Sequence, residues 1–174
     1  MNPAVAPFDP ALLEPLDILL YFTPCLADFV IAIKTYSLIG HVEISWTKTT
    51  SVAARSAGVK EYPFRSEGLK RVLRSNLPPD YALAKTWFEK NADGKAYNFF
   101  GLCSFEWPGD KQLPLWQKWE KDRWFCSELA TDILRAAGTH PFSDLYPSIK
   151  VPPALFLASP NLREIWTSEP AKQP

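Results

Sequence analysis

The chain has 174 residues, with 19 basic and 19 acidic side chains, 47% hydrophobic residues and 22% charged residues. This length suits a single domain with a sizeable core, and the composition excludes an intrinsically disordered chain. A formal net charge of zero argues against a protein that coats polyanions, so no nucleic acid partner is expected. Seventeen prolines, seven tryptophans and eleven phenylalanines predict stiff loops and an aromatic interior or groove.

The three cysteines are Cys25, Cys103 and Cys126, and they show no CxxC spacing. They predict neither a disulfide framework nor a metal site, and a reducing compartment is the simpler expectation. Residues 1–7 lack the basic region and the apolar run of a secretory signal, so we expect cytoplasmic localisation after synthesis. The apolar stretch 12–33 is interrupted by prolines and acidic residues and predicts no membrane span. The oligomeric state is not predicted.

The first half of the chain predicts a small antiparallel sheet. Residues 1–14 are rich in proline and predict a flexible arm in front of a single domain over 15–168. Residues 17–22 are typical of a short buried strand, and residues 26–37 fit either a short helix or an ordered loop. The next segments predict a strand at 41–47, a turn at 48–50, a return strand at 51–55 and extended segments at 58–64 and 69–74.

The second half predicts two helices joined by loops. Asp80 is the expected cap of a helix over 81–91. Residues 122–138 predict a second helix, which ends at the left-handed stop expected of Gly138. Residues 97–102 predict a helix or turn, and the tryptophan-rich insertion at 107–119 is either a surface loop or one wall of a substrate groove. The last segments predict a loop at 141–153, a short apolar element at 154–159, a strand or turn at 162–166 and a tail at 169–174.

Cys126 lies in the first turn of the second predicted helix. The unpaired N–H groups and the dipole of a helix start stabilise a thiolate, and the same N–H groups can hold an oxyanion. Cys126 is therefore a candidate nucleophile, provided that a base reaches it. The alternative interpretation is a small buried residue, which is common for free cysteine.

The chain has two histidines that could act as the base, His41 and His140. His41 is the better candidate because it lies on a predicted strand, whereas His140 follows a helix end in a loop. Alternation places His41, Glu43 and Ser45 on one face of this strand, as expected of a strand that lines a cleft. The alternative interpretation of His41 is a structural histidine.

A third group usually orients a catalytic imidazole. Glu43 shares the face of His41, although side chains at positions i and i+2 are not expected to hydrogen-bond to each other. Ser51, Ser56 or a backbone carbonyl could serve instead of Glu43. The histidine and cysteine spacing predicts no zinc site, and no cofactor is expected.

Taken in chain order, several segments of this sequence resemble the circularly permuted NlpC-type branch of the papain-fold cysteine hydrolases, the YiiX/YaeF-like proteins. The resemblance covers most of residues 16–160. It implies an α+β fold with a small antiparallel sheet packed against helices and with the nucleophile at a helix N-terminus. The segments that carry it are 17–21, 40–44, 97–101, 125–129 and 151–156.

The resemblance also implies roles for individual residues. Cys126 would be the nucleophile, His41 the base and the Cys126 N–H part of an oxyanion hole. Many members carry a carboxylate on the strand after the histidine strand, but residues 51–55 contain none. This difference leaves the third residue open, with Glu43 as the nearest substitute.

The expected function is a cysteine hydrolase, an amidase or peptidase that works through an acyl-enzyme. The resemblance favours cell-wall peptides as substrates, and delivery by a partner would bring the protein to them. An acyl-lipid hydrolase or an acyltransferase on the same fold is the alternative within enzymes, with acyl-amide or ester substrates. The alternative outside enzymes is a non-catalytic binding or structural module, because the strand carboxylate is missing.

Overall fold

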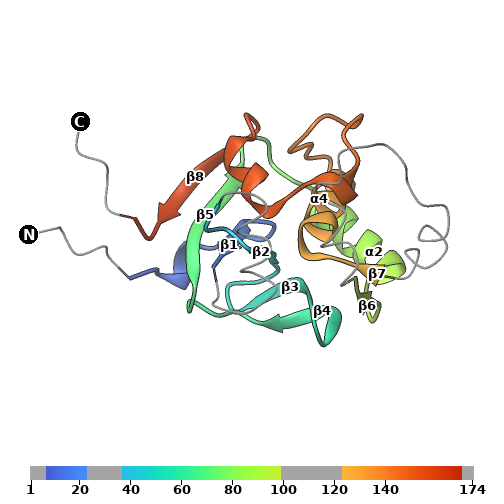
Figure 1. The fold of residues 1–174 in the computed structure, drawn as a ribbon, viewed down its shortest axis with the longest axis horizontal. Helices are drawn as coiled ribbons and strands as arrows, with labels where there is room; N and C mark the ends of the chain where they lie inside the picture. The colour runs from blue at the N-terminus through green and yellow to red at the C-terminus, as the bar shows by residue number, and fades with distance from the viewer. Residues whose placement is uncertain (1–6, 23–36, 99–122, 170–174) are drawn as a thin grey trace, which may run out of the picture.

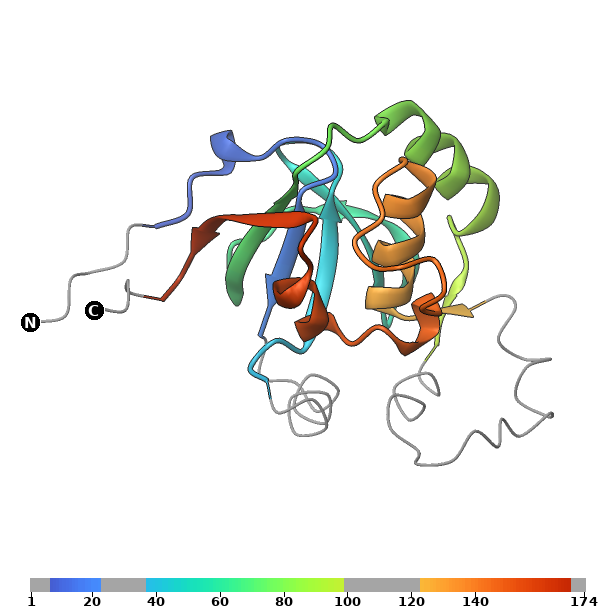
Figure 2. The same cartoon turned by 90° about the horizontal axis from the view of Figure 1, so that it is seen from above.

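A computed structural model describes residues 7–22, 37–98 and 123–169. Six strands form one sheet in the order β4-β3-β2-β1-β5-β8, and every neighbouring pair is antiparallel. The sheet lies on one side of the molecule, and the α-helices of the described residues lie on the other (Figures 1 and 2). Its strands are β1 (Ile18–Tyr21), β2 (His41–Ser45), β3 (Thr50–Arg55), β4 (Gly58–Pro63), β5 (Leu69–Ser75) and β8 (Leu162–Thr167).

Within the described residues, the remaining elements are short helices, two α-helices and a separate parallel pair of strands. The strands of this pair each have two residues. The α+β fold class expected from the sequence is confirmed in this form. These elements are η1 (Pro10–Leu12), α2 (Tyr81–Asn91), β6 (Ala96–Tyr97), β7 (Arg123–Trp124), α4 (Cys126–Ala136), η3 (Ser148–Lys150) and η4 (Pro153–Ala158).

The two faces of the sheet differ in what covers them, because successive strand residues point to opposite sides. Ile18 pairs with Ile44 in register, and Leu20 pairs with Val42. These four side chains belong to the same buried cluster as Leu129, Ile133 and Leu134 of α4. The opposite face carries a second cluster, formed by Leu13, Leu19, Tyr21, Leu69 and Val72.

Helix α4 is the central helix of the larger cluster. Gly138 adopts a φ of +75°, and the Thr139 N–H donates to the Leu134 carbonyl at 2.9 Å. This is a left-handed stop of the Schellman type, so the predicted end of the helix is confirmed. The predicted start at residue 122 is wrong. Helix α4 begins at Cys126, because Arg123 and Trp124 instead pair with Ala96 and Tyr97 in β7 and β6.

Helix α2 has the bounds expected from the sequence. The Asp80 side chain accepts a hydrogen bond from the Leu83 N–H at 3.0 Å, which satisfies one of the unpaired donors of the first turn. The Asp80 N–H in turn donates to the Ala137 carbonyl at 2.9 Å. The start of α2 is thereby joined to the end of α4.

Part of the expected N-terminal arm packs against the sheet. Residues 10–12 form η1, capped by Asp9, and Leu13 is almost fully buried. A proline at the start of a short helix is compatible with order, because the missing N–H is not needed there. The expectations for residues 26–36, 99–102, 107–119 and 170–174 fall outside the described residues.

Candidate active site

Cys126 is the first residue of α4 and is buried. The residue before the helix, Phe125, has no side-chain acceptor and provides no cap hydrogen bond. The positive end of the α4 dipole and the first N–H groups of α4 therefore lie at Cys126. This is the environment that stabilises a thiolate.

His41 begins β2, and the first residues of β2 and α4 lie at the same end of the two layers (Figure 2). The imidazole interacts with Cys126 by charge and by hydrogen bonding. Burial lowers the pKa of His41, but the interactions with Cys126 and with the Glu43 carboxylate outweigh burial and raise this pKa to about 10. An imidazole beside a cysteine at a helix start is in a position to act as the base that a cysteine nucleophile needs.

Glu43 lies two residues further along β2, and its Oε1 is 3.0 Å from the Nε2 of His41. The expectation that positions i and i+2 would not hydrogen-bond is therefore wrong, because the His41 ring extends along its own strand toward the carboxylate. Burial raises the pKa of Glu43, but hydrogen bonds and charges from His41, Arg55 and Ser51 outweigh burial and lower it to about 2. Glu43 is thus a buried, ionised carboxylate in contact with the imidazole.

Three further side chains hold Glu43. Arg55 on β3 donates to both carboxylate oxygens, and the Ser51 hydroxyl donates to Oε2 at 2.6 Å. Arg65 approaches Oε1 at 3.4 Å from the segment between β4 and β5. The polar face of β2 therefore forms a buried hydrogen-bond network around Glu43.

Arg55 and Arg65 were not among the candidates from the sequence. Ser51 was a candidate to contact His41, but it contacts Glu43 instead. Alternation along residues 50–55 places Ser51 and Arg55 on one face of β3, and this pattern could have indicated Arg55 as a partner of Glu43. No comparable local pattern indicates Arg65, because it follows the end of β4.

The other two candidates lie away from the Cys126–His41–Glu43 group. The His140 ring donates to or accepts from Asp144, with 2.7 Å between Nδ1 and Oδ1, and half of its side chain is exposed. Ser56 lies in the turn between β3 and β4 and lines a cavity. Neither residue is therefore placed to orient His41.

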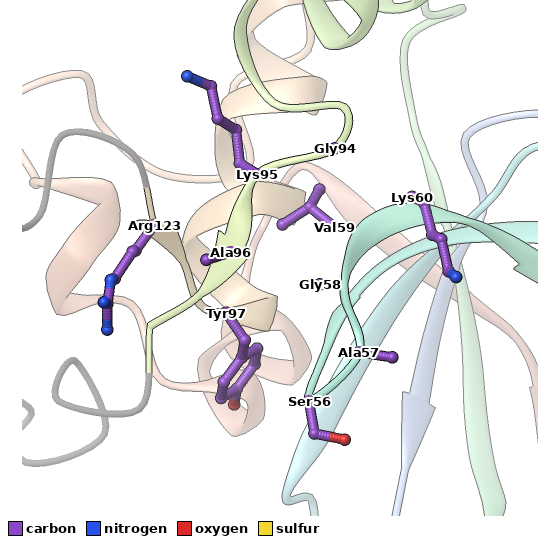
Figure 3. Close-up of a pocket in the computed structure, with 10 residues that line it drawn as sticks. All are labelled: Ser56, Ala57, Gly58, Val59, Lys60, Gly94, Lys95, Ala96, Tyr97 and Arg123. Carbon is purple, nitrogen blue, oxygen red and sulfur yellow. The ribbon is translucent and has the colours of Figure 1, made fainter.

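This cavity has a volume of about 490 Å³ and lies between the β3–β4 turn and β6. Its lining includes Lys60, Lys95 and Arg123, but none of Cys126, His41 and Glu43. Figure 3 shows that the three basic side chains point away from one another. These three side chains therefore do not converge on one point of the cavity.

A metal centre needs several side-chain donors that converge on one point. Within residues 7–22, 37–98 and 123–169, no three histidine, cysteine or acidic side chains are grouped so that they could hold a metal ion. His41 Nε2 lies 3.0 Å from Glu43 Oε1, and Cys126 and Glu43 both act on the His41 imidazole. Also within these ranges, none of the helices is long and apolar enough to cross a membrane.

Comparisons with known proteins identify a likeness of fold. No family model matches the chain, and neither does any curated protein. Among solved structures, the chain is similar to the crystal structure of the metalloprotein YiiX from Escherichia coli, with a TM-score of 0.62 and 18% sequence identity. The match covers 88% of this chain and 97% of that chain. The structural likeness to YiiX agrees with the α+β architecture and with the resemblance noted in the sequence.

Proposed function

We propose that the protein is a cysteine hydrolase with a permuted papain-like arrangement, in which the histidine strand precedes the cysteine helix. Cys126 is the nucleophile, His41 the general base and acid, and Glu43 the group that orients His41. The observation that carries this proposal is the position of the His41 imidazole, which contacts Cys126 and donates to Glu43. A nucleophile, a base and an orienting group in this order are the pattern of covalent acyl-transfer enzymes.

In the first half of the reaction, the Cys126 thiolate attacks the carbonyl carbon of an amide or ester. The carbonyl electron pair moves to oxygen, and N–H groups at the start of α4 stabilise the resulting oxyanion. The oxyanion then collapses and the C–N or C–O bond breaks. Because Nε2 of His41 donates to Glu43, Nδ1 is the nitrogen that passes its proton to the departing amine or alcohol.

In the second half, the acyl group is held as a thioester on Cys126. Water attacks the thioester carbon while His41 removes a proton from this water. Collapse of the second oxyanion releases the carboxylic acid and restores the Cys126 thiolate next to protonated His41. An acceptor other than water in the same position would make the protein an acyltransferase.

Cell-wall peptides are the proposed substrate class, because the enzymes that the sequence resembles act on them. Acyl lipids are the second candidate within enzymes. The proposed steps use the side chains of Cys126 and His41, with Glu43 as the orienting group.

One observation favours a non-catalytic module as the second class of function. Only 1% of Cys126 and 7% of His41 is exposed, so a substrate carbonyl has little access to the thiol in this conformation. In such a module, the Cys126–His41–Glu43 group would stabilise a binding scaffold. A hydrolase would form an acyl group on Cys126 when substrate is added, whereas a binding module would not.

The deciding experiment combines a substrate-independent and a substrate-dependent measurement. The ultraviolet absorbance of thiolates is measured against pH in wild type, Cys126→Ser and His41→Asn. Subtracting the Cys126→Ser titration removes the contribution of Cys25 and Cys103. We expect a Cys126 thiolate signal at neutral pH that is lost in His41→Asn. His140→Asn is the matched control, because it removes the other histidine and should leave the signal unchanged.

The substrate-dependent measurement uses peptidoglycan fragments and short-chain acyl esters. We expect Cys126→Ala to lower turnover by about 1000-fold or more, and intact-mass spectrometry to detect an acyl adduct that Cys126→Ala lacks. Equal turnover in wild type and Cys126→Ala, with no adduct on either, would contradict the hydrolase and favour the binding module.

A further inference from the structure

We propose that Arg55 is a positioning residue, which holds the Glu43 carboxylate in the orientation that directs the His41 imidazole toward Cys126. This inference rests on the proposed function for its effect on turnover, but its effect on Glu43 and His41 can be measured without a substrate. It assigns a role to Arg55 on β3, the strand that follows the histidine strand and contains no carboxylate.

The contact between Arg55 and Glu43 is a two-pronged fork. Arg55 Nε and Nη2 lie 3.0 and 2.8 Å from Glu43 Oε1, and Nη2 lies 2.9 Å from Oε2. A planar guanidinium that donates to both oxygens fixes the plane of a carboxylate. Oε1 of this plane is the atom that accepts from His41 Nε2 at 3.0 Å.

The guanidinium of Arg55 is itself held in place. It lies 4.2 Å from the ring centroid of Tyr62, and the Tyr62 hydroxyl donates to the Gly58 carbonyl at 2.8 Å. Gly58 is the register partner of Arg55 at the end of the β3–β4 hairpin. The residues that hold the Arg55 guanidinium therefore belong to the β3–β4 hairpin, and its position does not depend on a long loop.

After His41, Arg55 also favours the charged form of Glu43. The Glu43 side chain is fully buried, and a carboxyl without partners in such a place is neutral. The groups that face it are His41, Ser51, Arg55, Arg65 and the rings of Tyr21 and Tyr62. Of the two arginines, only Arg55 makes the close fork, since Arg65 Nη2 is 3.4 Å from Oε1. A neutral Glu43 would no longer stabilise a protonated His41.

The test compares four variants with wild type: Arg55→Gln, Arg55→Lys, Arg65→Gln and Arg163→Gln. Arg163 is exposed on β8 at the opposite edge of the sheet and is the control. Carbon and nitrogen NMR report the titration of Glu43 and the Nε2–H of His41, and circular dichroism confirms folding. We expect Arg55→Gln to raise the titration midpoint of Glu43 by about 1–3 pH units and to weaken the Nε2–H hydrogen bond. Arg163→Gln should change neither.

The conservative variant separates charge from geometry. Arg55→Lys keeps a positive charge, so the Glu43 midpoint should rise less than in Arg55→Gln, while the loss of the fork still disturbs His41. Arg65→Gln should shift the midpoint less than Arg55→Gln. An unchanged Glu43 midpoint and an unchanged His41 signal in folded Arg55→Gln would overturn the proposal, whether or not the protein has turnover.

Turnover provides the final distinction. If Arg55 acts through Glu43, then the single variant Arg55→Gln lowers kcat by about 10-fold or more. In a protein that already carries Glu43→Gln, adding Arg55→Gln has no further effect. An additive loss with a raised KM would mean that Arg55 contacts the substrate, and it would overturn the positioning role. Absence of turnover in wild type would contradict the proposed function, and the NMR measurements alone would then decide the role of Arg55.

Discussion

Arg74 and Asp17 form a two-pronged ion pair that joins β5 to the residue before β1. Arg74 Nε lies 2.7 Å from Asp17 Oδ1, and Arg74 Nη2 lies 2.8 Å from Oδ2. Arg74 also donates to the Leu12 carbonyl and to Glu14. Asp17 is only 1% exposed, so this pair anchors the N-terminal segment through a buried carboxylate.

Removing Arg74 should therefore destabilise the protein. Arg74→Met leaves the Asp17 carboxylate buried without its main partner, and we expect the free energy of unfolding to fall by about 3 kcal/mol or more. Urea denaturation measures the change. Arg163→Met is the control, because Arg163 is exposed and is the register partner of Arg74 on β8, and it should change stability by less than about 0.5 kcal/mol. Equal losses in the two variants would contradict the anchoring role.

Replacing Cys126 should change the titration of His41. Burial lowers the pKa of His41, and the Cys126 thiolate is the largest of the contributions that raise it to about 10. In Cys126→Ser the thiolate charge is absent, so we expect this pKa to fall by more than about one pH unit. NMR titration of the imidazole gives the value, and a midpoint that stays near 10 would show that Cys126 does not form an ion pair with His41.

Acid should destabilise the protein through Glu43. The pKa of Glu43 is lowered from 4.5 to about 2 in the folded protein, so its stabilising contribution is present above pH 4.5 and is lost as the pH falls toward 2. This difference corresponds to about 3 kcal/mol, at about 1.4 kcal/mol per pH unit. We expect Glu43→Gln to remove this part of the acid-induced loss, measured as urea stability between pH 4.5 and 2. A loss of the same size in both proteins would be inconsistent with an ionised Glu43 in the folded state.

Two glycines with positive φ should differ in their tolerance of alanine. At Gly138, where φ is +75°, an added Cβ meets no atom within 4 Å, so Gly138→Ala costs only the left-handed backbone strain, about 1–2 kcal/mol. At Gly58, where φ is +100°, the added Cβ would lie 3.0 Å from the Lys95 carbonyl oxygen. We expect Gly58→Ala to lose more stability than Gly138→Ala by thermal unfolding. The reverse order would mean that the hairpin moves away from Lys95 at little cost.

Local hydrogen bonding explains which elements could be predicted from the sequence. The cap of α2 requires an acceptor at Asp80, and the stop of α4 requires a left-handed residue at Gly138, so both signals lie within a few residues of the element. The alternation at His41–Ser45 likewise follows from a strand with one face on the core. By contrast, the start of α4 was misplaced because Arg123 and Trp124 pair with residues 96–97, which are distant in sequence.

The residue types of the candidate site could be predicted from the local sequence: a cysteine at a helix start, a histidine on a strand and a carboxylate on the same strand face. The tertiary structure alone decided that His41 contacts both Cys126 and Glu43, and that two arginines meet the same carboxylate. The physical reason is separation along the chain, since Arg55 and Arg65 lie 12 and 22 residues from Glu43. Only the pairing of β2 with β3 and the return of the chain after β4 bring both arginines to the buried Glu43 carboxylate. There, the charged partners of Glu43 offset the cost of burying its charge.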